Sequence, residues 1–130
     1  MLKLENIVAG YGHITALKDI SLEVPQGSIV SLIGANGAGK STTMKTIMGL
    51  VKPTSGKVLF EGQDITGHKT HQIVHGGISL VPEGRQILQD MSVYENLEMG
   101  AYIRNDNEIE ADIKKVFKRF PILDERSYQL

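Results

Sequence analysis

Short runs of alternating apolar and polar side chains dominate the first part of the chain. Residues 2–8 and 20–24 repeat with the two-residue period of half-buried strands, and turns follow them at residues 10–12 and 25–27. Residues 28–33 are more continuously apolar, which is typical of a strand buried on both faces. The pattern therefore predicts two strands in a hairpin that deliver the chain to residue 34.

The spacing of apolar residues becomes helical after residue 40. Met44, Ile47 and Met48 lie three and four residues apart, which predicts an amphipathic helix. Gly49 is suited to the end of this helix, and Pro53 follows as a further stop signal. We expect the methionines of this helix to fill the core.

Strand and helix signals then alternate as far as Pro82. Residues 57–60 predict a strand, residues 70–75 a short helix, and residues 78–81 an apolar strand. The helix is stopped by Gly76-Gly77. Such alternation is typical of α/β proteins, in which helices pack on a sheet.

Helical signals replace strand signals from residue 92 onward. Ser92 and Glu95 have the spacing of a capping box, which predicts a helix over residues 93–102. A polar break at residues 104–107 precedes a second helix, which Pro121 ends. The apolar face of this second helix carries Ile109, Ile113, Val116, Phe117 and Phe120.

The bulk composition narrows the class of protein. With 130 residues and 41% hydrophobic content, the chain is long enough for one globular domain and too short for two. Its net charge of -1 argues against a nucleic-acid-binding surface, and the lack of cysteine excludes disulfides and thiolate chemistry. No apolar run is long enough to span a bilayer, so we expect a cytoplasmic protein that meets membranes through another protein.

The strongest chemical signal lies between the predicted buried strand and the helix after it. This loop has the glycine, lysine and serine spacing of a phosphate loop and reads Gly34-Ala35-Asn36-Gly37-Ala38-Gly39-Lys40-Ser41, with Thr42 next. Glycines let successive backbone N–H groups turn inward around a polyphosphate, because no Cβ fills the concavity. A plain strand-to-helix turn is the alternative interpretation. The strand-to-helix context favours nucleotide binding.

Three side chains of this loop have predicted roles in binding a nucleotide. Lys40 can place an ammonium on the β- and γ-phosphates, and the Ser41 hydroxyl suits one position of an octahedral Mg²⁺. Thr42 can add a hydroxyl for the α-phosphate. The positive end of the helix that begins near Lys40 also favours a bound anion.

Tyr11 and three histidines are weaker candidates for binding roles. Tyr11 lies between two glycines and is interpreted either as a packing lid over an edge strand or as a ring that stacks on a base. His71 and His75 lie one helical turn apart, with His68 nearby, which is a spacing that two metal ligands use. Because no nearby cysteine or carboxylate completes the set, we favour a solvated helix face.

These segments resemble the ATP-binding subunit of ABC transporters along essentially the whole chain. The matching segments, in the family's order and spacing, are Tyr11-Gly12, Ala16-Leu17, Ile20-Ser21, the phosphate loop through Thr42, Gly49-Leu50, and residues 53–56 and 92–97. The resemblance implies an α/β fold, namely a P-loop NTPase core of the ABC type with an N-terminal antiparallel β subdomain and the start of a helical subdomain.

The resemblance also implies how the chain divides. Residues 1–130 are expected to be the N-terminal part of a single ABC ATP-binding domain. Within it, residues 1–91 are expected to form the β subdomain and the P-loop core through the Q-loop. Residues 92–130 are expected to begin the helical subdomain.

Two residues outside the phosphate loop gain roles from this resemblance. Tyr11 occupies the position whose ring stacks on adenine. Glu83 falls in the Q-loop, which senses the γ-phosphate and the attacking water, so it is a candidate for Mg²⁺ binding and, with Lys40, for catalysis. The family usually has glutamine there, and the run from Pro82 to Arg85 resembles the branch that energises branched-chain amino acid import. An ion pair between Arg85 and Glu83 is the alternative interpretation of both charges.

Cofactors and partners follow from the same resemblance. The expected ligands are ATP and Mg²⁺. The expected partners are a second ATP-binding subunit, transmembrane permease subunits on the inner face of the cell membrane and, indirectly, a periplasmic or extracellular amino-acid-binding protein. The family's signature loop, its Walker B strand and its switch histidine do not occur in residues 1–130, so we expect this chain alone to hydrolyse ATP poorly or not at all.

Other functions share part of this pattern. The chain could be a non-enzymatic nucleotide-binding fragment, or its parent a soluble ABC protein that uses ATP as a clamp on another macromolecule. A GTPase would need an Asn-Lys-x-Asp base reader, which these residues lack. Small-molecule kinases share the phosphate loop but have no place for Tyr11 or residues 92–97.

Overall fold

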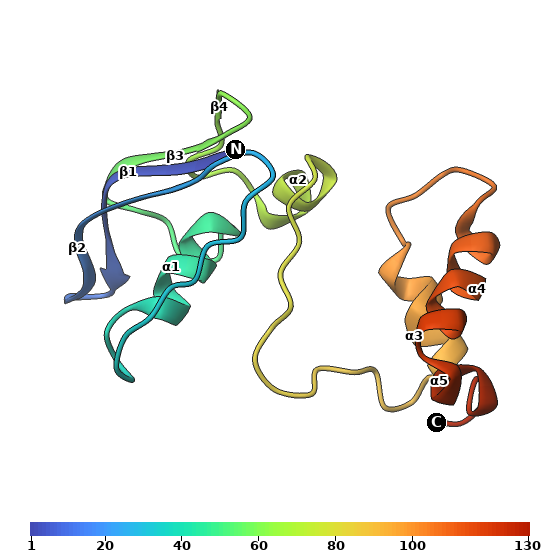
Figure 1. Ribbon diagram of the computed structural model, residues 1–130. Coiled ribbons are helices and arrows are strands. Elements are labelled where there is room, and N and C mark those ends of the chain that lie inside the picture. Colours follow the sequence, from blue (N-terminus) through green and yellow to red (C-terminus); the bar gives the residue numbers. More distant parts are fainter. The chain divides into compact units, whose positions relative to one another are not determined.

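In the computed structural model, which describes residues 1–130, the chain divides into the units Met1–Val81 and Pro82–Leu130 (Figure 1). The first unit contains β1 (Leu2–Tyr11), β2 (Ile14–Val24), α1 (Lys40–Ile47), β3 (Ser55–Phe60), β4 (Gln63–Asp64) and α2 (Thr70–His75). The second contains α3 (Val93–Gly100), α4 (Ile109–Arg119) and α5 (Pro121–Glu125). The expected subdomain boundary between residues 91 and 92 stays a prediction.

The first unit is built on one antiparallel sheet with the strand order β2-β1-β3-β4. Leu4 pairs with Leu22 on one side and with Val58 on the other, so β1 is a central strand. The strands predicted at residues 2–8, 20–24 and 57–60 are confirmed. Strand β2 begins earlier than expected, because the chain turns back after Tyr11 and pairs that residue with Ile14.

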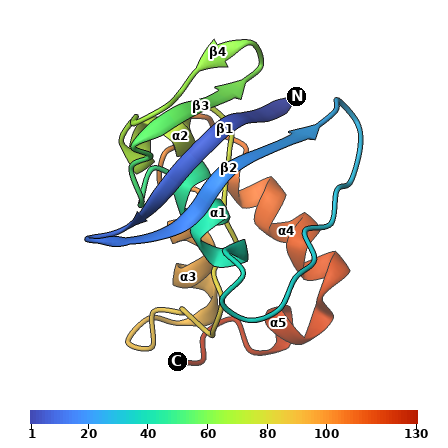
Figure 2. The same ribbon diagram turned by 90° about the vertical axis from the view of Figure 1, so that its left-hand side faces the viewer.

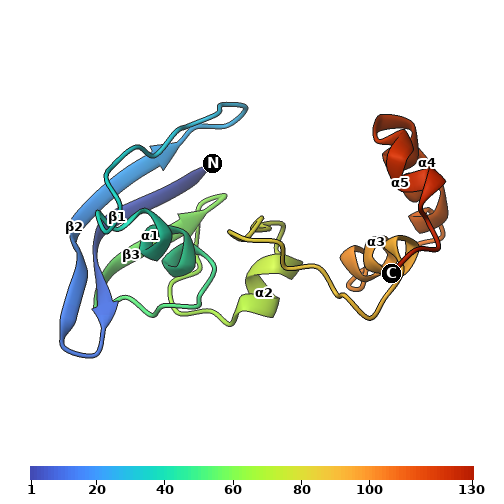
Figure 3. The same ribbon diagram turned by 90° about the horizontal axis from the view of Figure 1, so that it is seen from below.

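Strands β1 and β2 bend around α1 (Figure 3). Their register shifts at several places, and Asn6 and Asp19 beside these shifts have positive φ angles of 49° and 57°. The Asn6 side-chain amide donates to Asp19 Oδ1 (2.8 Å), and the Asn6 backbone N–H donates to the Ser21 hydroxyl (2.9 Å). Because such bulges bend strands and increase their twist, the sheet gains a concave face that receives the helix.

Helix α1 packs on this face of the sheet (Figure 2). The core of the unit consists of Leu4, Ile7, Ala9, Leu17, Ile47, Val51 and Val58. Two buried threonines of α1 join it, because Thr43 and Thr46 donate their hydroxyls to the backbone carbonyls four residues earlier (2.8 and 2.7 Å). No fully buried side-chain polar atom in the chain lacks a partner.

The expectation that both methionines of the predicted helix, Met44 in α1 and Met48 just after it, fill the core is wrong for one of them. Met48 is buried, but Met44 is 39% exposed. The helix turns Thr43, Thr46 and Ile47 inward instead, which places Met44 at the edge of the packed face. Threonine can occupy such buried positions when its hydroxyl bonds the preceding helical turn.

Two apolar segments that the sequence predicts as strands are not strands. Residues 28–33 and 78–81 have no ladder partner in the chain, and Ile29, Ile33 and Val81 are 97%, 91% and 92% exposed. A strand that is apolar on both faces is stable only between neighbouring strands and covering layers. The sheet that does form ends at β2 and β4, so the predicted hairpin over residues 20–33 is wrong.

The second unit begins at a capped helix. Ser92 Oγ accepts from the Glu95 N–H (3.2 Å) and the Ser92 N–H donates to the Glu95 carboxylate (2.8 Å), which confirms the capping box. The carbonyls of Ser127 and Gln129 accept from the first two N–H groups of α3 (2.8 and 2.9 Å). Residues 123–130 therefore satisfy donors that a helix start leaves unpaired.

Helix α4 follows the predicted apolar pattern in part. Ile113 is buried, and the Phe117 ring lies 6.3 Å from the Tyr94 ring of α3. Phe120 is beyond the end of α4 and 56% exposed, so the apolar face ends before it. None of the helices combines the length and the hydropathy needed to cross a bilayer.

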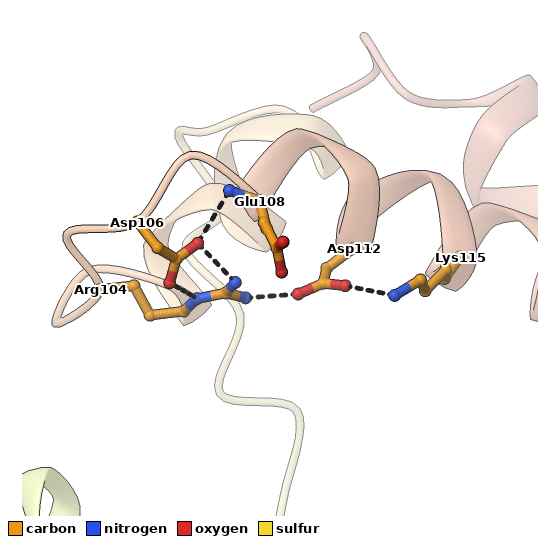
Figure 4. A network of polar contacts seen from close by, with 5 residues as sticks. All are labelled: Arg104, Asp106, Glu108, Asp112 and Lys115. Atoms are coloured by element: carbon orange, nitrogen blue, oxygen red, sulfur yellow. Dashed lines mark hydrogen bonds and ion pairs between the residues drawn. The ribbon is translucent and has the colours of Figure 1, made fainter.

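Arg104 organises the turn between α3 and α4 (Figure 4). Its guanidinium donates two hydrogen bonds to Asp106 (2.9 and 2.8 Å) and one to Asp112 (2.8 Å), which also accepts from Lys115 (2.9 Å). The Asp106 carboxylate also accepts from the Glu108 N–H (2.8 Å). The hydrogen bonds from Arg104, followed by that from Glu108, lower the pKa of Asp106 from 3.8 to about 2.

This network makes the second unit sensitive to acid. The pKa of Asp106 is lower in the folded chain, so its stabilising contribution is complete above pH 3.8 and is lost as the pH falls towards about 2. We expect Arg104→Met to lower the free energy of unfolding at neutral pH and low salt. The difference in free energy of unfolding between this variant and the unmodified chain should shrink as the pH falls from 3.8 towards about 2. Urea unfolding followed by far-UV circular dichroism measures this difference.

Arg126→Met is the matched control, because Arg126 is exposed and forms no ion pair. Its free energy of unfolding should follow that of the unmodified chain at every pH. A gap for Arg104→Met that stayed constant between neutral pH and pH 2 would contradict the role of Asp106.

Candidate functional site

The glycine-rich loop runs from the unpaired segment 28–33 to the start of α1. The Ala38 N–H donates to the Ala35 carbonyl (3.1 Å), which closes a four-residue turn centred on Asn36 and Gly37. Gly37 has a φ of 85°, close to the value that the third residue of a type II turn adopts. A residue with a Cβ would be strained in this conformation, so glycine is required here.

Gly39 joins the loop to α1 and rests on β2. It has a φ of 101°, and an added Cβ would lie 2.7 Å from Leu17 Cδ2 and 3.2 Å from the Ala16 carbonyl oxygen. Both the backbone conformation and the lack of space therefore exclude a larger residue. The contact with Ala16 and Leu17 determines where α1 begins relative to the sheet.

The start of α1 offers backbone donors that nothing in the chain uses. Gly39 supplies no side-chain cap, and the first α1 N–H with a partner is that of Thr43, which donates to the Gly39 carbonyl (2.8 Å). No hydrogen bond within the chain involves the backbone N–H groups of Gly37, Gly39, Lys40, Ser41 and Thr42. An anion at this point would meet these donors and the positive end of the helix.

The Lys40 ammonium folds back over the loop. It donates to the backbone carbonyls of Gly34 and Ala35, at 2.8 Å for Ala35. No carboxylate forms an ion pair with Lys40, so its positive charge is not compensated within the chain. An uncompensated cation beside unused N–H groups is a suitable environment for a polyphosphate.

The two hydroxyl residues after Lys40 differ in exposure. Ser41 is exposed and its hydroxyl makes no hydrogen bond in the chain, whereas Thr42 is only 7% exposed. A free hydroxyl beside the loop suits a Mg²⁺ ligand, and this role of Ser41 stays a prediction. No group of three or more histidine, aspartate or glutamate side chains lies close enough to hold a metal ion.

Tyr11 lies at the end of β1 in the same unit as the loop. Its side chain is 48% exposed, so it does not form a buried packing lid. The Lys45 ammonium of α1 lies 6.0 Å from the centre of its ring, within the range of a cation–π contact. The sequence analysis missed Lys45. Nothing in the sequence around Lys45 indicates a contact with Tyr11, which lies 34 residues earlier at the end of β1.

Glu83 belongs to the second unit, whereas the phosphate loop belongs to the first. Its side chain is exposed, and its backbone carbonyl accepts from Gln86 Nε2 (3.4 Å). Neither Glu83 nor Arg85 forms an ion pair, so the two charges do not neutralise each other. The catalytic and metal-binding roles of Glu83 stay predictions.

Known proteins resemble the chain along most of its length. The family profile described as "ABC transporter" matches residues 17–130. The high-affinity branched-chain amino acid transport ATP-binding protein BraG of Pseudomonas aeruginosa is 41% identical over 99% of this chain and 55% of its own length. The lipopolysaccharide export system ATP-binding protein LptB of Haemophilus influenzae is 38% identical over 82% of this chain and 44% of its own length.

Solved structures give the same result. An ATP-binding cassette of an ABC transporter superposes with a TM-score of 0.79 at 33% identity, covering 98% of this chain and 56% of that one. The ATP-binding subunit of an ABC transporter gives 0.83 at 29% identity, covering 98% and 52%. The chain thus spans about half the length of the relatives it matches, and it has the α/β fold of the N-terminal part of such a cassette. With its phosphate loop set between the sheet and α1, the chain belongs to the ABC transporter family of ATP-binding proteins.

Proposed function

We propose that this chain is the nucleotide-binding part of an ABC importer ATPase that energises high-affinity uptake of branched-chain amino acids. The observation that carries the nucleotide part is the loop itself, with its unused backbone donors and its uncompensated Lys40 ammonium. The amino-acid part is supported by BraG, a branched-chain amino acid transport protein that is similar over nearly the whole chain. It is also supported by the run from Pro82 to Arg85.

The phosphate loop would bind the polyphosphate tail of ATP. Lys40 would exchange its two loop carbonyls for β- and γ-phosphate oxygens, so that its ammonium meets anionic acceptors in place of neutral ones. The free N–H groups of Gly37 and of residues 39–42 would donate to the same tail. The Ser41 hydroxyl would hold Mg²⁺, which neutralises part of the phosphate charge when bound.

The half-exposed Tyr11 ring would receive the adenine base. One requirement for stacking is an accessible ring face, and Tyr11 has no aromatic neighbour that covers it. Lys45 lies near the ring and adds positive charge on the side of α1. Together with the loop, Tyr11 would distinguish a nucleotide from inorganic polyphosphate.

The remaining roles belong to the whole protein. We propose that ATP draws two such subunits together on transmembrane permease subunits at the inner face of the membrane, with Glu83 near the γ-phosphate and Mg²⁺. Relatives that serve other cargoes, such as lipopolysaccharide and ribose, have similar identities over shorter stretches. The cargo is therefore the least specific part of the proposal.

Replacing the loop lysine tests whether the loop binds phosphates. Lys40→Ala should lower the affinity for ATP-Mg²⁺ about tenfold or more, because it removes the charge-assisted hydrogen bonds to the tail. Isothermal titration calorimetry on the 130-residue chain measures this change. Lys52→Ala, an exposed lysine outside the loop, should bind as the unmodified chain does. Equal affinities for the two variants would mean that the loop does not bind the nucleotide.

Replacing the aromatic ring tests base recognition separately. Tyr11→Ala should weaken ATP binding by about tenfold, because stacking of a base on an aromatic ring contributes about 1–3 kcal/mol. Binding of inorganic tripolyphosphate should not change. Tyr11→Phe keeps the ring and should retain ATP affinity. If Tyr11→Ala weakened both ligands equally, the stacking role would be wrong.

Residues 1–130 should not by themselves hydrolyse ATP at a measurable rate. Phosphate release from ATP by residues 1–130 should not exceed that of the Lys40→Ala variant, because no residue here matches the family's water-activating carboxylate. A phosphate-release assay with both proteins at equal concentration provides the measurement. Steady release that disappears in Lys40→Ala would show that this chain is itself an ATPase.

A further inference from the structure

The centre of the phosphate loop also carries a group that can react with its own backbone. Asn36 is followed by Gly37, and this is the single Asn-Gly pair in the sequence. Both residues are exposed, and an added Cβ at Gly37 would meet nothing within 4 Å. We propose that Asn36 is a site of spontaneous deamidation, and that the carboxylate formed there weakens polyphosphate binding by the loop. The effect on polyphosphate binding rests on the proposed function.

The reaction needs only water. The backbone nitrogen of Gly37 attacks Cγ of Asn36, so an N–Cγ bond forms while the Cγ–NH₂ bond breaks and ammonia leaves with the nitrogen's proton. The product is a five-membered succinimide ring. Water then opens one of the two ring C–N bonds, adding hydroxyl to the carbonyl carbon and hydrogen to the nitrogen. Aspartate or isoaspartate results, and no atom is oxidised or reduced.

The nucleophile and the leaving group are both unengaged. No hydrogen bond in the chain uses the Gly37 N–H, which must lose its proton to attack. The Asn36 side-chain amide likewise has no partner. Glycine leaves the nitrogen open to approach because it has no side chain, whereas any other following residue crowds it.

The other asparagines are less reactive for reasons visible in the structure. The Asn6 amide is bonded to Asp19, and the Asn96 side chain is bonded to several backbone groups around the start of α3. The two remaining asparagines, Asn105 and Asn107, are exposed. Each is followed by an aspartate or a glutamate, whose side chain hinders the backbone nitrogen, and not by glycine. They serve as internal controls.

The loop is also free to reach the reactive geometry. In the type II turn, the peptide between Asn36 and Gly37 must rotate before the nitrogen can reach Cγ. Only the Ala35 carbonyl holds this turn, by accepting from the Ala38 N–H (3.1 Å) and from the Lys40 ammonium (2.8 Å). The preceding segment 28–33 is not held in any ladder. A bound polyphosphate would use the Gly37 N–H as a donor and hold the turn. The ligand should therefore slow the reaction.

Deamidation would cancel the net positive charge that the loop presents. It adds one negative charge at a position four residues from Lys40, where the incoming ligand is itself an anion. An isoaspartate would also lengthen the backbone of the turn, which misplaces the N–H groups around it. We expect the affinity for inorganic tripolyphosphate to fall on the order of tenfold or more.

Ageing of the purified chain tests the proposal. The 130-residue chain is incubated at mildly alkaline pH and physiological temperature, with and without saturating tripolyphosphate, and peptides are analysed by mass spectrometry for the change from amide to carboxyl. Asn36 should convert well before Asn105 and Asn107, and tripolyphosphate should slow only Asn36. Conversion of Asn36 no faster than the controls would overturn the proposal. So would a rate that the ligand leaves unchanged.

Two variants connect the modification to binding. Asn36→Asp should reproduce the affinity loss of the aged chain, and Asn36→Gln, which cannot easily form the ring, should hold its own initial affinity through ageing. Unchanged tripolyphosphate affinity after complete conversion of Asn36 would overturn the proposed effect of deamidation on binding. If the fresh chain bound neither ATP nor tripolyphosphate, the proposed function would fail, while the mass analysis without ligand would still decide whether Asn36 reacts.

Discussion

The close approach of Gly39 to β2 is the constraint on which the site depends. An added Cβ there would meet Leu17 at 2.7 Å, so only glycine lets the loop lie against the sheet at this point. The contact sets the first turn of α1, and with it the direction of the unused N–H groups that follow. The bend that the Asn6 and Asp19 bulges give to the strands brings the sheet to this helix. The geometry of the glycine-rich loop is thus a product of sheet curvature as well as of its own glycines.

Local signals in the sequence predicted the structure well. The Ser92 and Glu95 capping box, the short helix at residues 70–75 and the β1–β2 hairpin all depend on interactions between neighbours in the sequence or across one turn. The glycine spacing of the phosphate loop is also local, and the structure adds the positive φ angles and the free donors that the spacing requires. What could be predicted is what a short stretch of chain determines by itself.

Predictions failed where a segment needs partners distant in sequence. Residues 28–33 have the apolar pattern of a buried strand, but a pattern states only what a segment can bury and not whether a neighbour is present. The contact of Lys45 with Tyr11 and the return of the Ser127 carbonyl to the start of α3 are likewise set by tertiary packing. The exposure of Met44 has the same origin, because the bend of the sheet decides which side of α1 faces inward.

The unpaired stretches at residues 28–33 and 78–81 make this chain prone to associate with other molecules. Each has main-chain donors and acceptors that no ladder uses, beside aliphatic side chains such as Ile29 and Val81. No proline or charged residue interrupts either stretch. Such stretches are templates for strand addition between molecules. Association between molecules through these stretches would therefore increase with protein concentration.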